Sequence, residues 1–370
     1  MDRSNRRGGG LAGGGRLRVL NLCESAQGGA GSYFRHIAAL SDHGFDMEFV
    51  LAQEHVAAVD AELRMTTFAR PRRGLGGLRA MLAAFRARLR GQDPDVCVFH
   101  SSFALAALAA MRAAGDRRPA VYCPHGWAAS SYPDAPLRRG LVRVLEGRGS
   151  GLADVTLCVS EHDREVARAF GYPGRFEVVE NGVPPPRADA RSDLFGGEDG
   201  LIHLLFVGRL DRQKGFDLLV EAFEQAARPD LRLHVVGEAV RGDGARRAPG
   251  EGIVMHGWVP ASRLDDWYAS ADALLVPSRW EAFGLVVPEA LRNGTPVFTS
   301  DRGALPSLIE TGRTGGHVPL TVGALAALLR SLDRRALRAM RPACRAAYDA
   351  RFRVERQLEA LSVLLREVAR

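Results

Sequence analysis

Short apolar runs alternate with helical patterns along the first half of the chain. Six runs have the length and β-branched content of buried strands: 17–22, 46–52, 95–100, 120–125, 155–160 and 175–180. Five stretches between them are alanine-rich or have apolar residues at helical spacing: 32–44, 76–91, 101–115, 136–154 and 161–171. This strand–helix–strand order predicts a parallel sheet with right-handed crossovers.

The alternation stops at 181–200, where prolines, glycines and acidic residues predict an exposed linker. It then resumes with expected strands at 202–208, 231–237, 252–259, 271–277 and 295–300. Helices are expected near 216–227, 261–269, 286–293 and 304–310. The stretch 334–369 predicts a further helix, interrupted near Pro342.

The chain is therefore expected to be an α/β protein with two doubly wound, Rossmann-like domains that face a cleft. The expected parts are a flexible tail (1–15), an N-terminal domain (16–183), a linker (184–200), a C-terminal domain (201–345) and a C-terminal helix (346–370). In such sheets ligands bind beyond the carboxyl ends of the strands, so the loops after strands are the place to look for chemistry.

Composition narrows the class of protein only a little. The net charge of +7 permits contact with anionic partners but requires none, and aromatic residues do not interleave with basic ones as in nucleic-acid modules. No apolar run reaches the roughly 18–20 residues of a membrane span, and no signal-peptide pattern is found. Five cysteines without a C-x-x-C pair indicate buried thiols in a reducing, cytoplasmic compartment rather than a zinc site.

Lys214 is the only lysine among 50 basic residues, and it follows Arg209 by five positions. Both lie between an expected strand and an expected helix, at the carboxyl edge of the sheet. Two cations near a helix N-terminus are favourable when an anion lies between them, since a guanidinium grips phosphate oxygens and an ammonium adds a point charge. The alternative is a solvated loop that carries a chance lysine.

The segment "RWEAFGLVVPEA", 279–290, predicts a loop followed by a helix that begins near Leu285. Phe283, Gly284 and Leu285 can offer backbone N–H groups to a phosphate, and glycine allows a close approach. Glu281 in the loop and Glu289 in the helix can accept hydrogen bonds from sugar hydroxyls. The alternative is ordinary helix capping and surface charge.

Two features of the N-terminal half are weaker. Gly28, Gly29 and Gly31 separate a strand from a helix with Ser32 as expected N-cap, but they match neither the dinucleotide motif nor a P-loop. His125 follows a strand and can be functional or structural. No G-x-S-x-G or H-E-x-x-H motif occurs, and pyridoxal-phosphate chemistry would have only Lys214 to use.

Together these segments resemble the GT-B glycosyltransferases, in particular the large retaining group numbered family 4, over about residues 17–320. The most specific part is "FVGRLDRQKGFDLLVEAF" followed by "PSRWEAFGLVVPEALRNGTPVFTSDRGALPSLI", which looks like the family's E-x7-E motif and its trailing G-x-x-P. "VVENGV" and "GGAGSYFRHIAAL" add to the resemblance.

The resemblance implies a glycosyltransferase of the hexosyltransferase type that needs no metal or other cofactor. Arg209 and Lys214 would hold the diphosphate of a UDP- or GDP-sugar, and Glu281 would contact the sugar. Glu289 would bind the ribose. The remaining implied contacts are Phe283, Gly284 and Leu285 along the sugar and phosphate, Gly29 across the cleft, and His125 near the acceptor. The last helix would cross back to the N-terminal domain.

Two departures from the family pattern concern the base and a local loop. Ser307 replaces a frequent acidic residue after the G-x-x-P proline, and Glu238 leads into "AVRGDGARRAPGEG" where a glycine-rich turn is common. The reaction class is not affected by either.

The acceptor is open. The expected helix 76–91 carries Arg79, Arg86, Arg88 and Arg90, and Arg138, Arg139 and Arg143 follow further on. A helix of this kind can make peripheral contact with the anionic inner face of a membrane, in which case the acceptor would be a lipid-linked sugar in polysaccharide or glycolipid assembly. The alternative is a solvated helix face. Two rival functions on the same fold are a nucleotide-sugar epimerase and a protein that binds a nucleotide sugar without transferring it.

Overall fold

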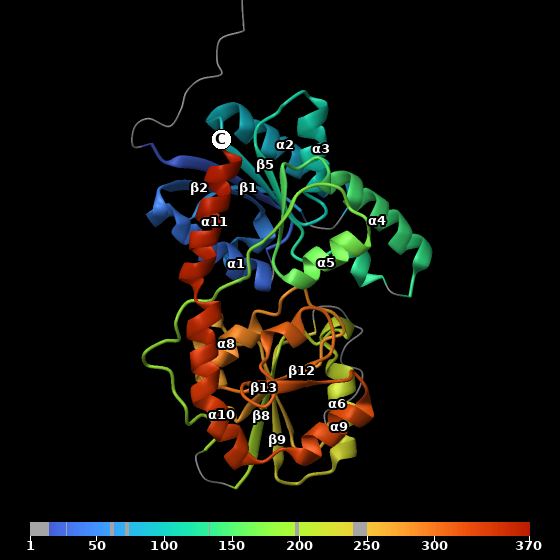
Figure 1. Cartoon of the computed structure of the whole chain (residues 1–370), viewed down its shortest axis with the longest axis vertical. Helices are drawn as coiled ribbons and strands as arrows, with labels where there is room; N and C mark the ends of the chain where they lie inside the picture. Colours follow the sequence, from blue (N-terminus) through green and yellow to red (C-terminus); the bar gives the residue numbers. More distant parts are fainter. Residues whose placement is uncertain are drawn as a thin grey trace, which may run out of the picture.

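The computed structural model folds the chain into two α/β lobes stacked along its long axis (Figure 1). It describes residues 15–26, 28–59, 63–70, 74–132, 134–196, 200–239 and 250–370. The N-terminal lobe contains a seven-stranded sheet and the C-terminal lobe a six-stranded one. This is the pair of doubly wound, Rossmann-like domains expected from the alternating pattern.

The N-terminal sheet is parallel throughout the described pairings, in the order β3-β2-β1-β4-β5-β6-β7. Its strands are β1 (Leu17–Cys23), β2 (Phe45–Ala52), β3 (Arg64–Phe68), β4 (Val96–His100), β5 (Ala120–Cys123), β6 (Val155–Cys158) and β7 (Phe176–Val178). The order reverses between β1 and β4, so the crevice expected to bind ligands lies at the carboxyl ends of these two strands.

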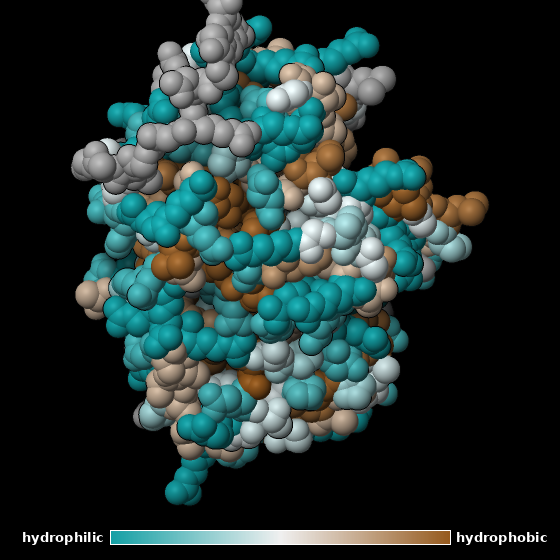
Figure 2. All heavy atoms as spheres, turned by 45° about the horizontal axis from the view of Figure 1, so that its top comes forward, coloured by the Kyte–Doolittle hydropathy of each residue, from teal (hydrophilic) through white to brown (hydrophobic). Residues whose placement is uncertain are grey.

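Helices cover both faces of this sheet. They are α1 (Gly29–Ala38), α2 (Leu75–Gln92), α3 (Leu105–Ala113), α4 (Pro136–Ser150) and α5 (Glu161–Ala169). Helix α4 projects at the side of the lobe (Figure 1), and Figure 2 shows hydrophobic residues at the right-hand edge of the molecule, where this helix lies. Helix α1 begins at Gly29 rather than after Ser32, because Gly28 turns the chain with a positive φ of 63°.

The C-terminal sheet has the order β10-β9-β8-β11-β12-β13 and reverses between β8 and β11. Its strands are β8 (Ile202–Val207), β9 (Leu231–Val236), β10 (Ile253–Gly257), β11 (Ala273–Val276), β12 (Val297–Ser300) and β13 (Gly315–Val318). Its helices are α6 (Phe216–Ala226), α7 (Leu264–Ser270), α8 (Val286–Arg292), α9 (Val322–Ser331) and α10 (Arg334–Ala347).

The chain crosses between the lobes twice, and the two crossings are hydrogen-bonded to each other. Val183 N–H donates to the Phe352 carbonyl (2.8 Å), and Val354 N–H donates to the Val183 carbonyl (3.1 Å). A Cβ on Gly182 would lie 2.5 Å from the Arg353 carbonyl oxygen, so this crossing admits only glycine at that position. These two hydrogen-bonded segments form the connection between the lobes.

Helix α11 (Val354–Val368) extends from this connection along the N-terminal lobe (Figure 1). Its buried leucines join the core that also holds residues of β1 and α1. Arg366 donates to the His43 carbonyl (2.8 Å) and lies over the Phe45 ring. The last segment of the chain therefore packs on the first lobe.

Three elements were not predicted, and one break was misplaced. β3 and β13 have only five and four residues, and α9 has Gly323 in its first turn, so none has a strong periodic pattern. The helical stretch continues through Pro342 in α10, and the break comes instead at a π-helical turn, Tyr348–Phe352. Among the described residues, no helix combines the length and apolar character needed to cross a bilayer.

Candidate functional site

Lys214 and Glu281 form an ion pair at the carboxyl edge of the C-terminal sheet. Lys214 lies just after β8 and Glu281 just after β11, the two strands where the sheet order reverses. Lys214 Nζ is 2.5 Å from Glu281 Oε1, and Ser278 Oγ donates to the same oxygen (2.9 Å). Both side chains are largely buried, with exposed fractions of 20% and 9%. Residues 67 positions apart thus meet where a doubly wound sheet binds its ligand.

Two glycines allow the loops to pack this closely. Gly215, at φ 70°, would place a Cβ 1.9 Å from the Pro277 carbonyl oxygen. Gly303, at φ 63°, would place one 2.3 Å from the Glu281 carbonyl oxygen. A side chain at position 215 would push the Lys214 loop away from the loop after β11. A side chain at position 303 would push its own turn away from Glu281.

Arg209 reaches the same loop through Gln213. Its guanidinium donates to Gln213 Oε1 (2.7 Å) and pairs with Asp211 (3.1 Å). Gln213 Nε2 in turn donates to the carbonyl of Trp280, the residue before Glu281 (3.2 Å). With 42% of its side chain exposed, Arg209 is the more accessible of the two predicted phosphate-binding cations.

Phe283, Gly284 and Leu285 carry the chain from Glu281 into α8. Phe283 is buried against the Phe352 ring, with centroids 6.2 Å apart, and therefore anchors the loop near the lobe crossing. Gly284 has a φ of 97°, which favours glycine. Leu285 is the N-cap residue of α8 and its side chain makes no capping hydrogen bond.

Glu289 lies one turn into α8 and is partly buried. Tyr268 OH donates to its Oε2 (2.8 Å), and burial raises its pKa while Arg292 opposes the shift. Glu289 follows the Glu281 loop in the chain, and its carboxylate is hydrogen-bonded to Tyr268 of α7. Its predicted contact with ribose stays a prediction.

The loop 281–285 touches the N-terminal lobe at several points. Ser160 Oγ donates to the Ala282 carbonyl (2.6 Å), and a Cβ on Gly126 would lie 2.9 Å from the Ala282 Cβ. A Cβ on Gly29 would lie 3.5 Å from Leu285 Cδ1. The glycine turn after β1 and the loop after β5 thus both face the loop that carries Glu281.

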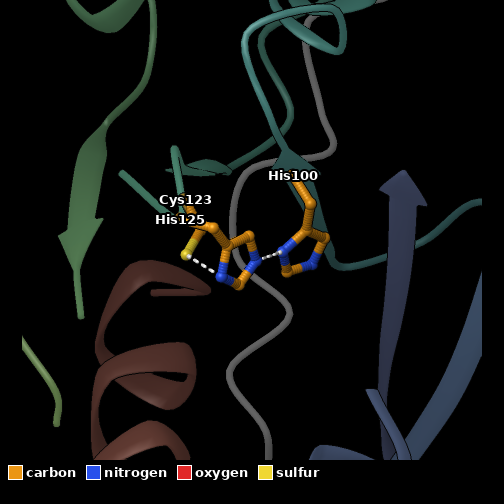
Figure 3. Close-up of side chains that lie close together, drawn as sticks. All are labelled: His100, Cys123 and His125. Carbon is orange, nitrogen blue, oxygen red and sulfur yellow. Dashed lines mark hydrogen bonds between the residues drawn. The ribbon is translucent and has the colours of Figure 1, made fainter. Parts of the chain in front are cut away.

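His125 belongs to a buried cluster at the carboxyl ends of β4 and β5 (Figure 3). Its Nε2 lies 2.9 Å from His100 Nδ1, and its Nδ1 lies 3.7 Å from Cys123 Sγ. The Tyr33 ring packs edge-on against it, with centroids 4.6 Å apart. His100 Nε2 contacts Asn21 Oδ1 at 3.1 Å.

The hydrogen bonds of this cluster fix its protons. Asn21 Nδ2 donates to the Glu48 carbonyl, so Asn21 Oδ1 accepts and His100 Nε2 carries the hydrogen. Burial lowers the pKa of His100 well below its usual range and that of His125 to about 4, so both rings are neutral. His100 Nδ1 must then accept from His125 Nε2–H, which leaves the His125 Nδ1 lone pair directed at Cys123.

The ligand atoms of His100, Cys123 and His125 lie within 4.8 Å of one another. Nitrogens bound to one tetrahedral zinc would stand about 3.3 Å apart, given Zn–N bonds of about 2.05 Å. The observed 2.9 Å separation of His100 Nδ1 and His125 Nε2 is that of a hydrogen bond. The cluster is therefore a chain of neutral hydrogen bonds.

Sequence reasoning singled out Lys214, Glu281 and His125 but not the residues around them. Ser278 bonds to Glu281, and Ser160 bonds to the same loop at Ala282. His100 bonds to His125 and, through its other ring nitrogen, to Asn21. None of these four residues carries a motif, and the signal that could have found Ser278, Ser160 and His100 is their position at or just after the end of a strand.

Comparison with known proteins decides the family. A model described as Glycosyl transferases group 1 matches residues 202–334, and one described as Glycosyltransferase Family 4 matches residues 27–187. The chain belongs to the GT-B glycosyltransferases. This glycosyltransferase is 30% identical over 330 residues to D-inositol 3-phosphate glycosyltransferase of Pseudarthrobacter chlorophenolicus, covering 78% of this chain and 77% of that one.

A further sequence relative and two solved structures are similar to the chain. An uncharacterized 41.2 kDa protein in the cps region of Klebsiella pneumoniae is 27% identical over 81% of this chain and 85% of its own. Sucrose-phosphate synthase of Thermosynechococcus elongatus superposes with a TM-score of 0.84 at 22% identity, over 95% of this chain and 99% of that one. Anabaena HepE, solved with UDP and glucose, gives a TM-score of 0.76 at 18% identity, over 95% and 100%.

Proposed function

We propose that this glycosyltransferase moves a sugar from a UDP- or GDP-sugar to an acceptor hydroxyl with retention of anomeric configuration. The observation that carries the proposal is the Lys214–Glu281 pair, which joins an ammonium and a carboxylate at the point where the C-terminal sheet reverses. The N-terminal lobe faces this point through Gly126 and Ser160. A cation for phosphate and a carboxylate for sugar hydroxyls are what a nucleotide-sugar site requires.

The donor would lie with its diphosphate at Arg209 and Lys214 and its sugar at Glu281. Lys214 would exchange its contact with Glu281 for one with a phosphate oxygen, and Glu281 would then accept from a sugar hydroxyl. Glu289 would hold the ribose, and Phe283 to Leu285 would supply backbone N–H groups. Support comes from HepE, which was solved in complex with UDP and glucose.

The reaction breaks the bond between the anomeric carbon and the diphosphate oxygen. Negative charge grows on the leaving diphosphate, and cations already in place stabilise it without reorganisation. Arg209 and Lys214 would do this in place of a metal ion. The acceptor oxygen would attack the face that the diphosphate leaves, passing its proton to the departing phosphate oxygen, so no residue is assigned as a covalent nucleophile.

Movement about the crossing at Val183 and Val354 would open the site to the donor and close it for transfer. Closure brings Ser160 and Gly126 to Ala282, as in the present arrangement of the lobes. It would exclude water and so limit hydrolysis of the donor.

The acceptor is proposed to be a sugar or a lipid-linked sugar in polysaccharide or glycolipid assembly, used by a cytoplasmic enzyme at the inner face of the membrane. A relative encoded in a cps region supports a role in polysaccharide assembly. The exposed arginines of the N-terminal lobe support contact with an anionic surface.

The decisive experiment presents the purified protein with a panel of UDP- and GDP-sugars, with and without an acceptor, and follows the products by mass spectrometry. Release of nucleoside diphosphate with free sugar or glycoside supports transfer, and the anomeric configuration of the glycoside by NMR tests retention. Conversion of one nucleotide sugar into another would identify an epimerase. Tight binding without turnover for every donor would identify a non-catalytic binding protein.

A further inference from the structure

Helix α4 carries an apolar stripe that faces solvent. Leu137, Leu141, Val144 and Leu145 have exposed fractions of 91%, 62%, 46% and 58%. Their spacing of four, three and one residues places them on one side of the helix. Four large apolar side chains gathered on one projecting helix are unlike the isolated exposed apolar residues of an ordinary surface, and Figure 2 shows the group at the edge of the molecule.

The charges beside the stripe are all positive. The exposed charged residues of α4 are all arginines, and two of them, Arg138 and Arg148, stand beside the stripe at helical spacing from Leu141 and Leu145. Arg139 and Arg143 lie on the opposite side of the helix, over the Phe170 ring. The one acidic residue of the helix, Glu146, is buried at 1% exposure, and its carboxylate is turned inward toward protein hydrogen-bond donors. The outer surface of α4 therefore combines apolar side chains with arginine alone.

Helix α2, the other arginine-bearing helix of this lobe, has a different surface. Its Met81, Phe85 and Leu89 are buried in the core, and Arg88 pairs with Glu48 at 2.7 Å. Its apolar side thus packs inward, and it shows no large apolar residue among those exposed in the described part of the chain. Arginine occurs on both helices, but only α4 presents apolar side chains with it.

We propose that the outer face of α4 binds an anionic lipid bilayer, with its leucines and valine among the acyl chains and with Arg138 and Arg148 at the lipid phosphates. This inference adds a membrane-binding surface to the proposed use of a lipid-linked acceptor. Only the biological purpose of that surface rests on the proposed function. A second copy of the chain fits the face poorly, because a twofold contact would bring the arginines of two helices together. Lipid phosphates instead complement them.

The position of α4 relates this surface to the site. Asp134, two residues before the helix, pairs with Arg212 of the Lys214 loop at 2.9 Å. Further along the helix, Glu146 accepts from the backbone N–H groups of Ala128 (2.8 Å) and Ala129 (3.0 Å), just after His125. A bilayer under α4 would therefore lie close to the loop that follows His125 and to the loop that carries Lys214.

The test is sedimentation of the full chain with vesicles of phosphatidylcholine alone or with phosphatidylglycerol added. At low salt the wild type should sediment with the anionic vesicles, and high salt should weaken this binding. The variant Leu137→Ser/Leu141→Ser should bind them at least tenfold more weakly. The variant Arg138→Gln/Arg148→Gln should bind more weakly and lose most of its salt dependence.

Two variants outside α4 serve as matched controls, one for the apolar residues and one for the arginines. Val363→Ser removes an apolar side chain that is 64% exposed on α11, and it should bind like the wild type. Arg79→Gln/Arg86→Gln/Arg90→Gln removes three arginines from α2 and should change the affinity less than twofold. Thermal melts must show that every variant is folded.

The proposal is overturned if the wild type fails to bind anionic vesicles at low salt, or if the leucine variant binds them as well as the wild type. It is equally overturned if the α2 variant alone loses binding, or if light scattering shows a dimer that the leucine variant abolishes. Vesicle binding without any turnover of nucleotide sugars would leave α4 as a lipid surface and refute the proposed transferase reaction. A leucine variant that still uses donor in solution but not on vesicles would support both.

Discussion

The two lobes share one topology but place opposite chemistry at their facing edges. The C-terminal edge holds a charged pair, Lys214 and Glu281, where β8 and β11 end. The N-terminal edge holds a neutral chain, Asn21–His100–His125, where β1, β4 and β5 end. Under the proposed function, the C-terminal lobe would supply charge to the donor, and the N-terminal lobe would supply shape and oriented hydrogen bonds.

Burial explains why the N-terminal edge remains neutral. It lowers the pKa of His125 to about 4 and that of His100 further, so neither ring takes up a proton near neutrality. Lys214 and Glu281 are also largely buried, but each has the opposite charge as a partner. Four substitutions test this contrast between a charged edge and a neutral edge.

Lys214→Ala should lower turnover or donor affinity at least tenfold, and up to about a thousandfold, since groups that stabilise charge developing in a transition state are worth this much. Steady-state kinetics with the donor found by screening would measure it. Arg212→Ala is the control, because Arg212 is a neighbour in the same loop with a side chain 62% exposed, and it should change the rate less than threefold. Wild-type kinetics for Lys214→Ala would remove the assigned role.

Glu146→Ala should lower the free energy of unfolding by about 3 kcal/mol, because buried hydrogen-bond donors lose their acceptor. The four donors are Ser102 Oγ (2.7 Å), the amides of Ala128 (2.8 Å) and Ala129 (3.0 Å), and Tyr172 OH (3.3 Å). Urea denaturation would measure the change.

The same experiment needs an exposed carboxylate for comparison. Glu161→Ala breaks the surface pair with Arg164 in the same lobe, and it should change stability by no more than about 0.5 kcal/mol. Equal losses for the two variants would show that Glu146 does not hold the loop after His125.

His125→Asn should flatten the dependence of stability on pH in the acid range. The folded ring stays neutral to about pH 4, whereas the unfolded ring takes up a proton below its ordinary pKa of 6.5. The His125 contribution is therefore present above pH 6.5 and is lost as the pH falls from 6.5 to 4. Urea midpoints at several pH values would show a steeper acid loss for the wild type than for the variant.

Asp163 acts in the opposite direction, because burial raises its pKa to about 7. Only the difference between the wild type and His125→Asn isolates the histidine. Parallel curves for the two proteins between pH 4 and 6.5 would mean that the ring is not held neutral in the fold.

Ser160→Ala should raise the KM for donor a few-fold, since it removes a 2.6 Å hydrogen bond between the lobes worth about 1 kcal/mol. Ser160 also caps α5, so the variant loses stability as well. Thr321→Ala removes the matching cap of α9 without a lobe contact and should lower stability by about 1 kcal/mol at unchanged KM. A rise in KM for both variants would assign the effect to stability alone.

The fold class, the two lobes and the position of Lys214 and Glu281 at one sheet edge could all be predicted from the sequence. Strand and helix periodicity is local, so the alternation was visible without tertiary structure, except for short elements such as β3 and β13. Arg209, Lys214 and Glu281 were found because each follows a strand, and parallel strands bring their ends to one edge. The unique lysine made the position easier to notice.

Which side chains meet, and which helix faces stay exposed to solvent, could be learned only from the tertiary structure. Asn21 and His100 are 79 residues apart, and no local pattern links them before β1 and β4 pair. The same holds for α2 and α4, since helical spacing predicts an apolar side for each but not what covers it. Packing buries the apolar side of α2 and leaves that of α4 in solvent, because burial depends on neighbours distant in the chain.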